Sequence, residues 1–305
     1  MKRRILVLSL VLLWLIPAST QATGVTSVDD DGPRAVERVA TLDFVTTEIV
    51  TLLGLEPVAV AGKPDYLEWV GIGADAVANA ANLGRRTEPN QESLAAANPQ
   101  LITGATFRHK PLADSLRRIA PVVLYNWLPA SDQQNPLEHT RALVRHLAQR
   151  IDRGAQAERL LTGMDEALAR QASRVREAGM AGEAVILAQH VRGTNRFNLY
   201  SEHSLGVAII QTLGLTNAWE GEPEKFGYTT VGLARLTRTA DAHMLLVAQP
   251  DDRAFEQVTN SPVWRSVPAV ASGRVHRLAP QTWFFGGPET ISQLARQFTD
   301  ALLSD

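Results

Sequence analysis

Residues 136–179 organise the chain, and they read PLEHTRALVRHLAQRIDRGAQAERLLTGMDEALARQASRVREAG. This segment has no Pro after its first residue, few Gly, and many Ala, Leu, Arg, Gln and Glu, which favour helices. Its apolar residues repeat at i, i+1, i+4 and i+8, first from Leu143 and again from Leu160, as on one helical face. We predict two consecutive helices, the second about 25 residues long, reaching Glu177 and spanning roughly 35 Å.

Short apolar runs alternate with helical periods on both sides of this segment. Before it we expect strands at 38–43, 58–62, 101–104 and 122–126 and helices at 44–55 and 111–120. After it we expect strands at 184–189, 243–249 and 275–278 and helices at 204–214 and 288–303. Alternation of this kind predicts mostly parallel sheets covered by helices. The predicted fold class is α/β, with an N-terminal lobe (23–153), a connecting helix (154–179) and a C-terminal lobe (180–305).

The first 22 residues have the parts of an export signal. Lys2, Arg3 and Arg4 give a positive start, residues 5–16 form an apolar run, and small residues lead to Ala22. That run is too short for a transmembrane helix, and no later stretch is long enough to span a bilayer. We expect cleavage near Ala22 and a soluble periplasmic protein. The chain has no cysteine, so we expect no lipid anchor.

The composition excludes several classes of function. The absence of cysteine removes disulfides, thiolate metal sites and a cysteine nucleophile, and the net charge of −2 argues against a nucleic-acid binder with a broad basic face. The sequence has no Walker A loop, GxGxxG after a strand, GxSxG elbow or HExxH, and no histidines pair at i,i+4. We therefore expect no enzymatic activity, no cofactor and no protein-held metal. An exported two-domain enzyme is the alternative from another class.

The segment NLGRRTEPNQES (82–93) carries two adjacent arginines, Arg85 and Arg86. In an extended loop neighbouring side chains point in opposite directions, so at most one of them faces a cleft. The alternative is that both are solvated surface charges. Pro89-Asn90 predicts the start of a helix, with Glu92 in its first turn.

The segment NAWEGEPEKFGYTT (217–230) places Trp219, Phe226 and Tyr228 in a Gly/Pro-rich loop. Loops that carry aromatic rings are unusual unless the rings fill something. We expect Trp219 to cap the local core. Phe226 is harder to bury locally.

A third aromatic segment is APQTWFFGGPE (279–289). Alternate residues of an extended chain share a side, so Trp283 and Phe285 face one way and Phe284 the other. The alternative is a buried aromatic knot ahead of the last helix.

These segments resemble the periplasmic substrate-binding proteins of iron–siderophore ABC transporters, most closely the ferric hydroxamate-binding branch. The resemblance covers residues 38–303. It implies two α/β lobes bridged by one long helix, a ligand in a shallow cleft between them and small lobe movements. It also implies a monomeric carrier that delivers an iron(III)–siderophore complex to an inner-membrane ABC permease with its ATPase. The motifs are GRRTEPN (84–90), RRIAP (117–121), TNAWEGE (216–222), SPVWRSVPAV with GRVHRL (261–278) and TWFFGG (282–287).

The resemblance implies a ligand site position by position. The arginine of GRRTEPN that contacts iron-bound hydroxamate oxygens is Arg86, and a planar guanidinium suits such coplanar, partly negative oxygens. Rings are implied at Trp283, Phe285 and Phe226. The last two are Phe where the family carries Tyr and Trp, so a hydrogen bond from position 285 is lost.

On the N-terminal side the resemblance places Trp69 and Phe44 at the cleft. The TFRHK segment (106–110) leaves the choice between Phe107 and His109 open, and its cations make a more anionic ligand plausible. Ferric citrate, a catecholate, haem and cobalamin are the alternative chelates. Haem would favour a ligand such as Tyr228 or His109.

The resemblance also implies docking on the permease through one acidic residue in each lobe. The N-terminal match is Glu92. The C-terminal match falls at Ala234, so we expect a neighbouring acid to substitute, and we assign Glu222.

Overall fold

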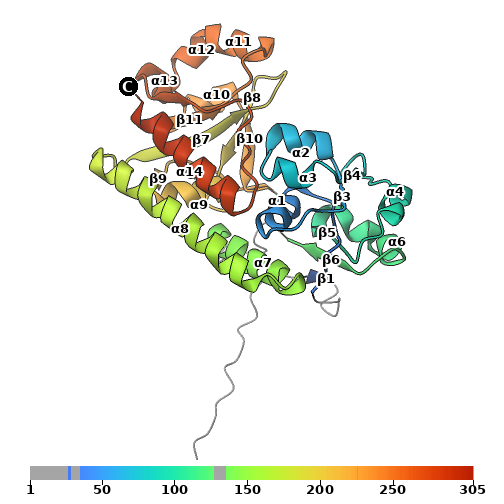
Figure 1. Ribbon diagram of the computed structural model, residues 1–305. Coiled ribbons are helices and arrows are strands. Elements are labelled where there is room, and N and C mark those ends of the chain that lie inside the picture. The colour runs from blue at the N-terminus through green and yellow to red at the C-terminus, as the bar shows by residue number, and fades with distance from the viewer. Residues whose placement is uncertain (1–26, 29–34, 127–134, 225, 305) are drawn as a thin grey trace, which may run out of the picture.

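The computed structural model describes residues 27–28, 35–126, 135–224 and 226–304. Two α/β lobes are joined by helix α8 (Gly154–Glu177), which runs along one side of the molecule beside α7 (Pro136–Arg150) (Figure 1). Both long helices are therefore confirmed. In the described part of the chain no helix is long and apolar enough to cross a membrane. The export signal expected at residues 1–22 lies outside the described residues.

The N-terminal lobe has a six-stranded sheet in the order β1-β6-β5-β2-β3-β4. All neighbours are parallel except β1 and β6, as the βα alternation predicted. The strands are β1 (Ser27–Val28), β2 (Val39–Thr41), β3 (Ala59–Val60), β4 (Ala81–Asn82), β5 (Leu101–Ala105) and β6 (Val122–Tyr125). The helices are α1 (Phe44–Leu52), α2 (Lys63–Trp69), α3 (Ala74–Val77), α4 (Gln91–Ala96), α5 (Thr106–His109), the 3₁₀ turn η1 (Lys110–Leu112) and α6 (Ala113–Arg117).

The C-terminal lobe has a sheet in the order β10-β8-β7-β11-β12, with β9 also paired to β7. Its strands are β7 (Ala184–His190), β8 (Arg196–Tyr200), β9 (Thr216–Asn217), β10 (Tyr228–Gly232), β11 (His243–Val247) and β12 (Val275–Arg277). Its helices are α9 (Leu205–Thr212), α10 (Leu233–Leu236), α11 (Arg253–Asn260), α12 (Pro262–Arg265), α13 (Pro268–Ala271) and α14 (Pro288–Leu303).

Two of the six strands of this second sheet correct the sequence-based expectation. Strands β8 and β10 were not predicted, and both run antiparallel to their neighbours. The segment 217–230, expected to be a loop throughout, passes into β10 at Tyr228, opposite Tyr200. The pattern missed these strands because β10 is only half-buried and follows a Gly/Pro-rich stretch, which conceals an alternation of period two.

The two lobes share one apolar core. Leu161 and Leu168 of α8 belong to the same buried cluster as Ile49 of α1, Leu187 of β7 and Phe298 of α14. Close-packed protein cores have low compressibility and transmit strain. The lobes are therefore fixed to a common helical backbone, and wide rotation about a hinge would expose that core.

Candidate functional site

Aromatic rings and one arginine meet where the two lobes face each other. Two ring pairs cross between the lobes: Phe44 lies 5.6 Å from Trp283, and Phe107 lies 5.6 Å from Phe226, measured between ring centroids. Phe285 is 5.5 Å from Trp283 and 6.3 Å from Phe226. We call this set the interlobe cluster; its members are Phe44, Arg86, Phe107, Phe226, Trp283 and Phe285.

Arg86 lies flat against the ring of Phe44. Its guanidinium carbon is 3.7 Å from the centre of that ring and 6.0 Å from the ring of Trp283. Gly62 makes room for it, because a Cβ there would lie 2.9 Å from Arg86 Cγ, and its φ of +67° suits glycine. Arg85 is exposed, so only one of the two arginines faces the other lobe, as the sequence predicted.

His109 binds the backbone of Arg86. The backbone N–H of Ala105 donates to His109 Nδ1 at 3.0 Å, so Nε2 carries the proton and donates to the carbonyl of Arg86 at 2.8 Å. The ring is buried, which lowers its pKa. Of the two residues left open by the sequence, Phe107 joins the interlobe cluster, and His109 supports it from within the lobe.

A second cation lies beside Arg86. The guanidinium of Arg108 stacks 4.7 Å above the ring of Phe107. Burial lowers the pKa of Arg86, and the positive charge of Arg108 lowers it further. The carboxylate of buried Asp43, which caps α1, opposes this effect on both arginines. The N-terminal face of the cluster therefore presents two like charges that an anion would stabilise.

The C-terminal face comes from the loop before α14. Trp283 and Phe285 are half-buried with their rings together, and Trp283 contacts Phe44 of the other lobe. Phe284 is instead buried against Tyr200 at 4.7 Å and Phe298 at 6.3 Å. The alternation expected for WFF is thus the observed arrangement. The aromatic-knot alternative describes Phe284 alone.

Tyr228 and Trp219 also have defined places. Tyr228 begins β10, and its ring lies 6.3 Å from Phe226 and 5.4 Å from Tyr200, at the edge of the interlobe cluster. Trp219 is only 6% exposed and packs in the C-terminal core, as expected.

Three predicted residues lie outside the cluster. Trp69 ends α2 and, among the described residues, makes no ring contact with the cluster. Glu92 is exposed in the first turn of α4, which Asn90 caps through Ser93 N. Glu222 is exposed ahead of β10. The docking roles of these two acids stay predictions.

One buried acid was missed by the sequence reasoning. Glu48 lies on α1, one turn after Phe44, and is fully buried against the start of α14. The signal that could have found it is a lone carboxylate on the otherwise apolar or Thr-lined helix 44–52, whose residues up to Thr51 are all buried.

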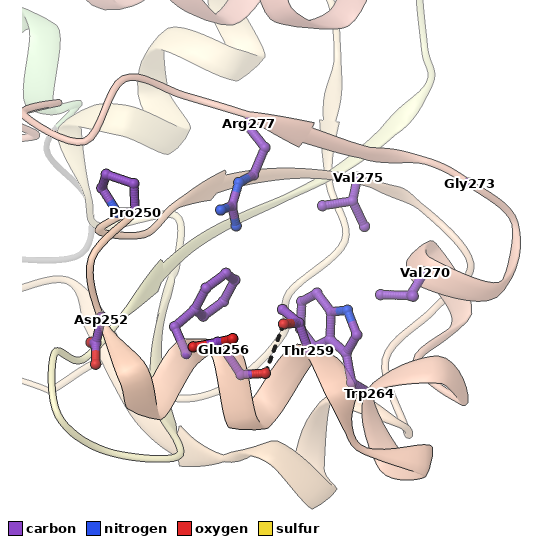
Figure 2. A pocket seen from close by; sticks show the side chains of 10 residues that line it. Pro250, Asp252, Glu256, Thr259, Trp264, Val270, Gly273, Val275 and Arg277 are labelled. Carbon is purple, nitrogen blue, oxygen red and sulfur yellow. Dashed lines mark hydrogen bonds between the residues drawn. The ribbon is translucent and has the colours of Figure 1, made fainter.

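The C-terminal lobe also has a pocket of its own, away from the interlobe cluster (Figure 2). Its volume is about 470 Å³, and Arg277 stacks 4.6 Å above the ring of Phe255 within it. Trp264 and Val270 from the 261–270 motif form part of its wall. No group of three or more His, Asp or Glu side chains able to hold a metal ion occurs among the described residues.

Known proteins match most of this chain. The family model for periplasmic binding proteins matches residues 39–282. The iron(3+)-hydroxamate-binding protein FhuD of Escherichia coli is 26% identical over 267 residues, which are 87% of this chain and 86% of that protein. The Fe(3+)-citrate-binding protein YfmC of Bacillus subtilis is 24% identical, over 84% of this chain and 78% of that protein.

Solved structures agree with these sequence relatives. The siderophore-binding protein FhuD from Vibrio cholerae, bound to Fe3+–Desferal, superposes with a TM-score of 0.78 and 28% identity. The match covers 88% of this chain and 98% of that one. The chain belongs to the periplasmic binding protein family.

Proposed function

We propose that this protein is a periplasmic carrier that captures an iron(III)–siderophore complex of the hydroxamate class and delivers it to an inner-membrane ABC permease. The observation that carries the proposal is Arg86, held by His109 and stacked on Phe44 between the two lobes. The relatives named for iron–hydroxamate and siderophore binding support it. The carrier performs no covalent step.

The geometry supplies the two kinds of contact that such a complex needs. Hydroxamate oxygens on iron are coplanar and partly negative, so a planar guanidinium can donate two parallel hydrogen bonds to them. The half-buried rings of Trp283, Phe285 and Phe226 cover the apolar arms of the chelator. Because the siderophore itself supplies the iron ligands, the protein recognises the outer surface of the complex.

The test is a tryptophan-fluorescence titration of the chain without residues 1–22. The probes are the iron(III) complexes of ferrichrome and desferrioxamine B, a ferric catecholate, ferric citrate, haem and cobalamin, with iron-free chelators as controls. We expect saturable quenching by a ferric hydroxamate at micromolar concentrations or below, and none by its iron-free form. Silence across the hydroxamates with saturation by another chelate would overturn the ligand class.

A second candidate ligand is a more anionic chelate such as ferric citrate. Arg108 favours it, because it places a second positive charge next to Arg86. Replacing Arg108 by Gln separates the two candidates. An anionic complex should lose affinity strongly and more so at low salt, whereas a neutral hydroxamate complex should change little.

The carrier must also meet its transporter. We propose that it acts as a monomer and that Glu92 and Glu222 contact the permease, one from each lobe. Charge reversal of each acid should reduce uptake by a reconstituted transporter and leave ligand affinity unchanged. Turnover of any ligand, in place of stoichiometric binding, would instead support the exported-enzyme alternative.

A further inference from the structure

The carboxylate of Glu48 joins the two lobes through hydrogen bonds. It sits on α1 of the N-terminal lobe, is 0% exposed, and accepts four hydrogen bonds from the first turn of α14. Its Oε2 accepts from Gly287 N at 2.8 Å and Thr290 Oγ1 at 2.7 Å. Its Oε1 accepts from Glu289 N at 3.1 Å and Thr290 N at 2.9 Å.

These bonds complete the start of α14. The first N–H groups of a helix have no partner within the helix, and Gly287 at the N-cap has no side chain to supply one. Pro288 has no N–H, so Glu48 satisfies every N–H group from residue 287 to residue 290. A carboxylate is also favoured there by the positive end of the helix dipole.

The glycine pair before α14 is explained by this contact. A Cβ on Gly287 would lie 3.1 Å from the Glu48 carboxyl and 3.2 Å from Ile49 Cγ1. A Cβ on Gly286 would lie 2.3 Å from the Thr290 side chain. Both glycines therefore allow the chain to close tightly over the carboxylate directly after Trp283 and Phe285.

Helix α1 thus contacts both Arg86 and the loop before α14. Phe44 and Glu48 are four residues apart and share a helix face. The ring of Phe44 stacks with the guanidinium of Arg86 and contacts Trp283. Glu48 accepts hydrogen bonds from the turn that follows Phe285. We propose that Glu48 is a positioning residue, which sets the 282–287 loop, and with it Trp283 and Phe285, against Arg86. The part of this proposal that concerns ligand affinity rests on the proposed function.

The first experiment measures amide hydrogen exchange by NMR in the ligand-free protein. Three backbone N–H groups and the Thr290 hydroxyl face Glu48. The hydroxyl can reverse and accept from a glutamine NH₂ group, but a backbone N–H cannot, so Glu48→Gln must lose at least one backbone bond and sets an NH₂ against that N–H. We expect exchange at residues 282–290 to accelerate about tenfold or more. Thr290→Val, which loses one bond, should give the same pattern with smaller amplitude and covers the case in which Glu48→Gln fails to fold.

Asp300→Asn is the matched control. Asp300 lies near the other end of α14 and pairs with Arg174 of α8 at 2.7 Å, so this variant removes a carboxylate from α14 without touching the loop. It should leave exchange at 282–290 unchanged. If Glu48→Gln accelerates only residues 287–290 and leaves 282–286 at the wild-type rate, the loop does not depend on Glu48 and the proposal is wrong.

The second experiment is a double-mutant cycle with the iron(III) complex of desferrioxamine B. If the loop holds its binding arrangement about a tenth of the time in Glu48→Gln, apparent affinity falls about tenfold. In a background that lacks both positioned rings, Trp283→Ala with Phe285→Ala, the same change should cost less than about twofold, because the groups that Glu48 positions are gone. Equal losses in both backgrounds would show a merely structural role. Failure of the wild type to bind any probe would refute the proposed function, and the exchange pattern alone would then decide the role of Glu48.

Discussion

Replacing Arg86 by Ala removes the guanidinium that the proposed ligand would contact. A hydrogen bond to a charged group contributes about 1.5–3 kcal/mol, and each 1.4 kcal/mol is tenfold in affinity, so the dissociation constant should rise about 10- to 150-fold. The upper part of this range is reasonable here, because Arg86 is partly withdrawn from water and already held in place by Phe44 and His109. Binding should not have to immobilise it.

The chain supplies a matched control for this variant. Arg85 is the adjacent residue with the same charge and is exposed. Arg85→Ala should therefore change affinity by less than about twofold, and Arg86→Lys, which keeps the charge and loses the planar fork, should fall between the two. The assay is the fluorescence titration with a ferric hydroxamate, beside thermal unfolding of each variant. Equal losses for the two alanine variants, or a change within twofold for Arg86→Ala, would refute the site.

Three further predictions follow from the described contacts. Gly287→Ala should destabilise the protein by about 1–3 kcal/mol, because its Cβ would press on Glu48, whereas Gly232→Ala meets nothing within 4 Å and should be nearly neutral in denaturant unfolding. Burial lowers the pKa of His109, so the neutral ring stabilises the fold fully above pH 6.5, the ordinary pKa of histidine, and this stabilisation is lost as the pH falls below that value. His109→Gln should therefore show a smaller fall in unfolding free energy between pH 7 and about pH 5 than the wild type does. Arg108→Gln should reduce the salt dependence of binding for an anionic chelate, and an unchanged salt dependence would exclude Arg108 from the site.

The parts of the fold that the sequence predicted are those with a long local period. Helix α8 carries an apolar stripe over some 24 residues, and the alternation of Trp283, Phe284 and Phe285 is a property of extended backbone. Strands β8 and β10 are five residues each, lie toward one edge of their sheet and have no comparable period. Their pairing is decided by tertiary contact, which no local pattern records.

The candidate site likewise has parts that follow from local sequence patterns and parts that depend on tertiary contacts. Arg86 and the rings could be named from motifs. The way in which the site is supported could not. His109 was a candidate for the cleft but acts through the Arg86 carbonyl 23 residues earlier, and Glu48 acts through amides some 240 positions later. The first contact depends on how the N-terminal lobe folds, and the second on how the two lobes meet. The lone carboxylate of helix 44–52 could have been marked as unusual, but its partners in α14 could not have been named.

The shared core and the interlobe rings together indicate how the proposed ligand would enter. Two ring pairs, Phe44–Trp283 and Phe107–Phe226, already bridge the lobes, and the common core opposes a wide hinge motion. Each aromatic pair contributes about 0.5–1.5 kcal/mol, so parting both costs about 1–3 kcal/mol, or roughly 5- to 150-fold in affinity. A ligand regains that energy only if its own surface replaces the lost ring contacts. The apolar arms of a siderophore can do so, whereas a small hydrated anion cannot. Under the proposed function the rings would therefore favour large chelates over small ones, and Arg86 would contact the partly negative oxygens of the chelate.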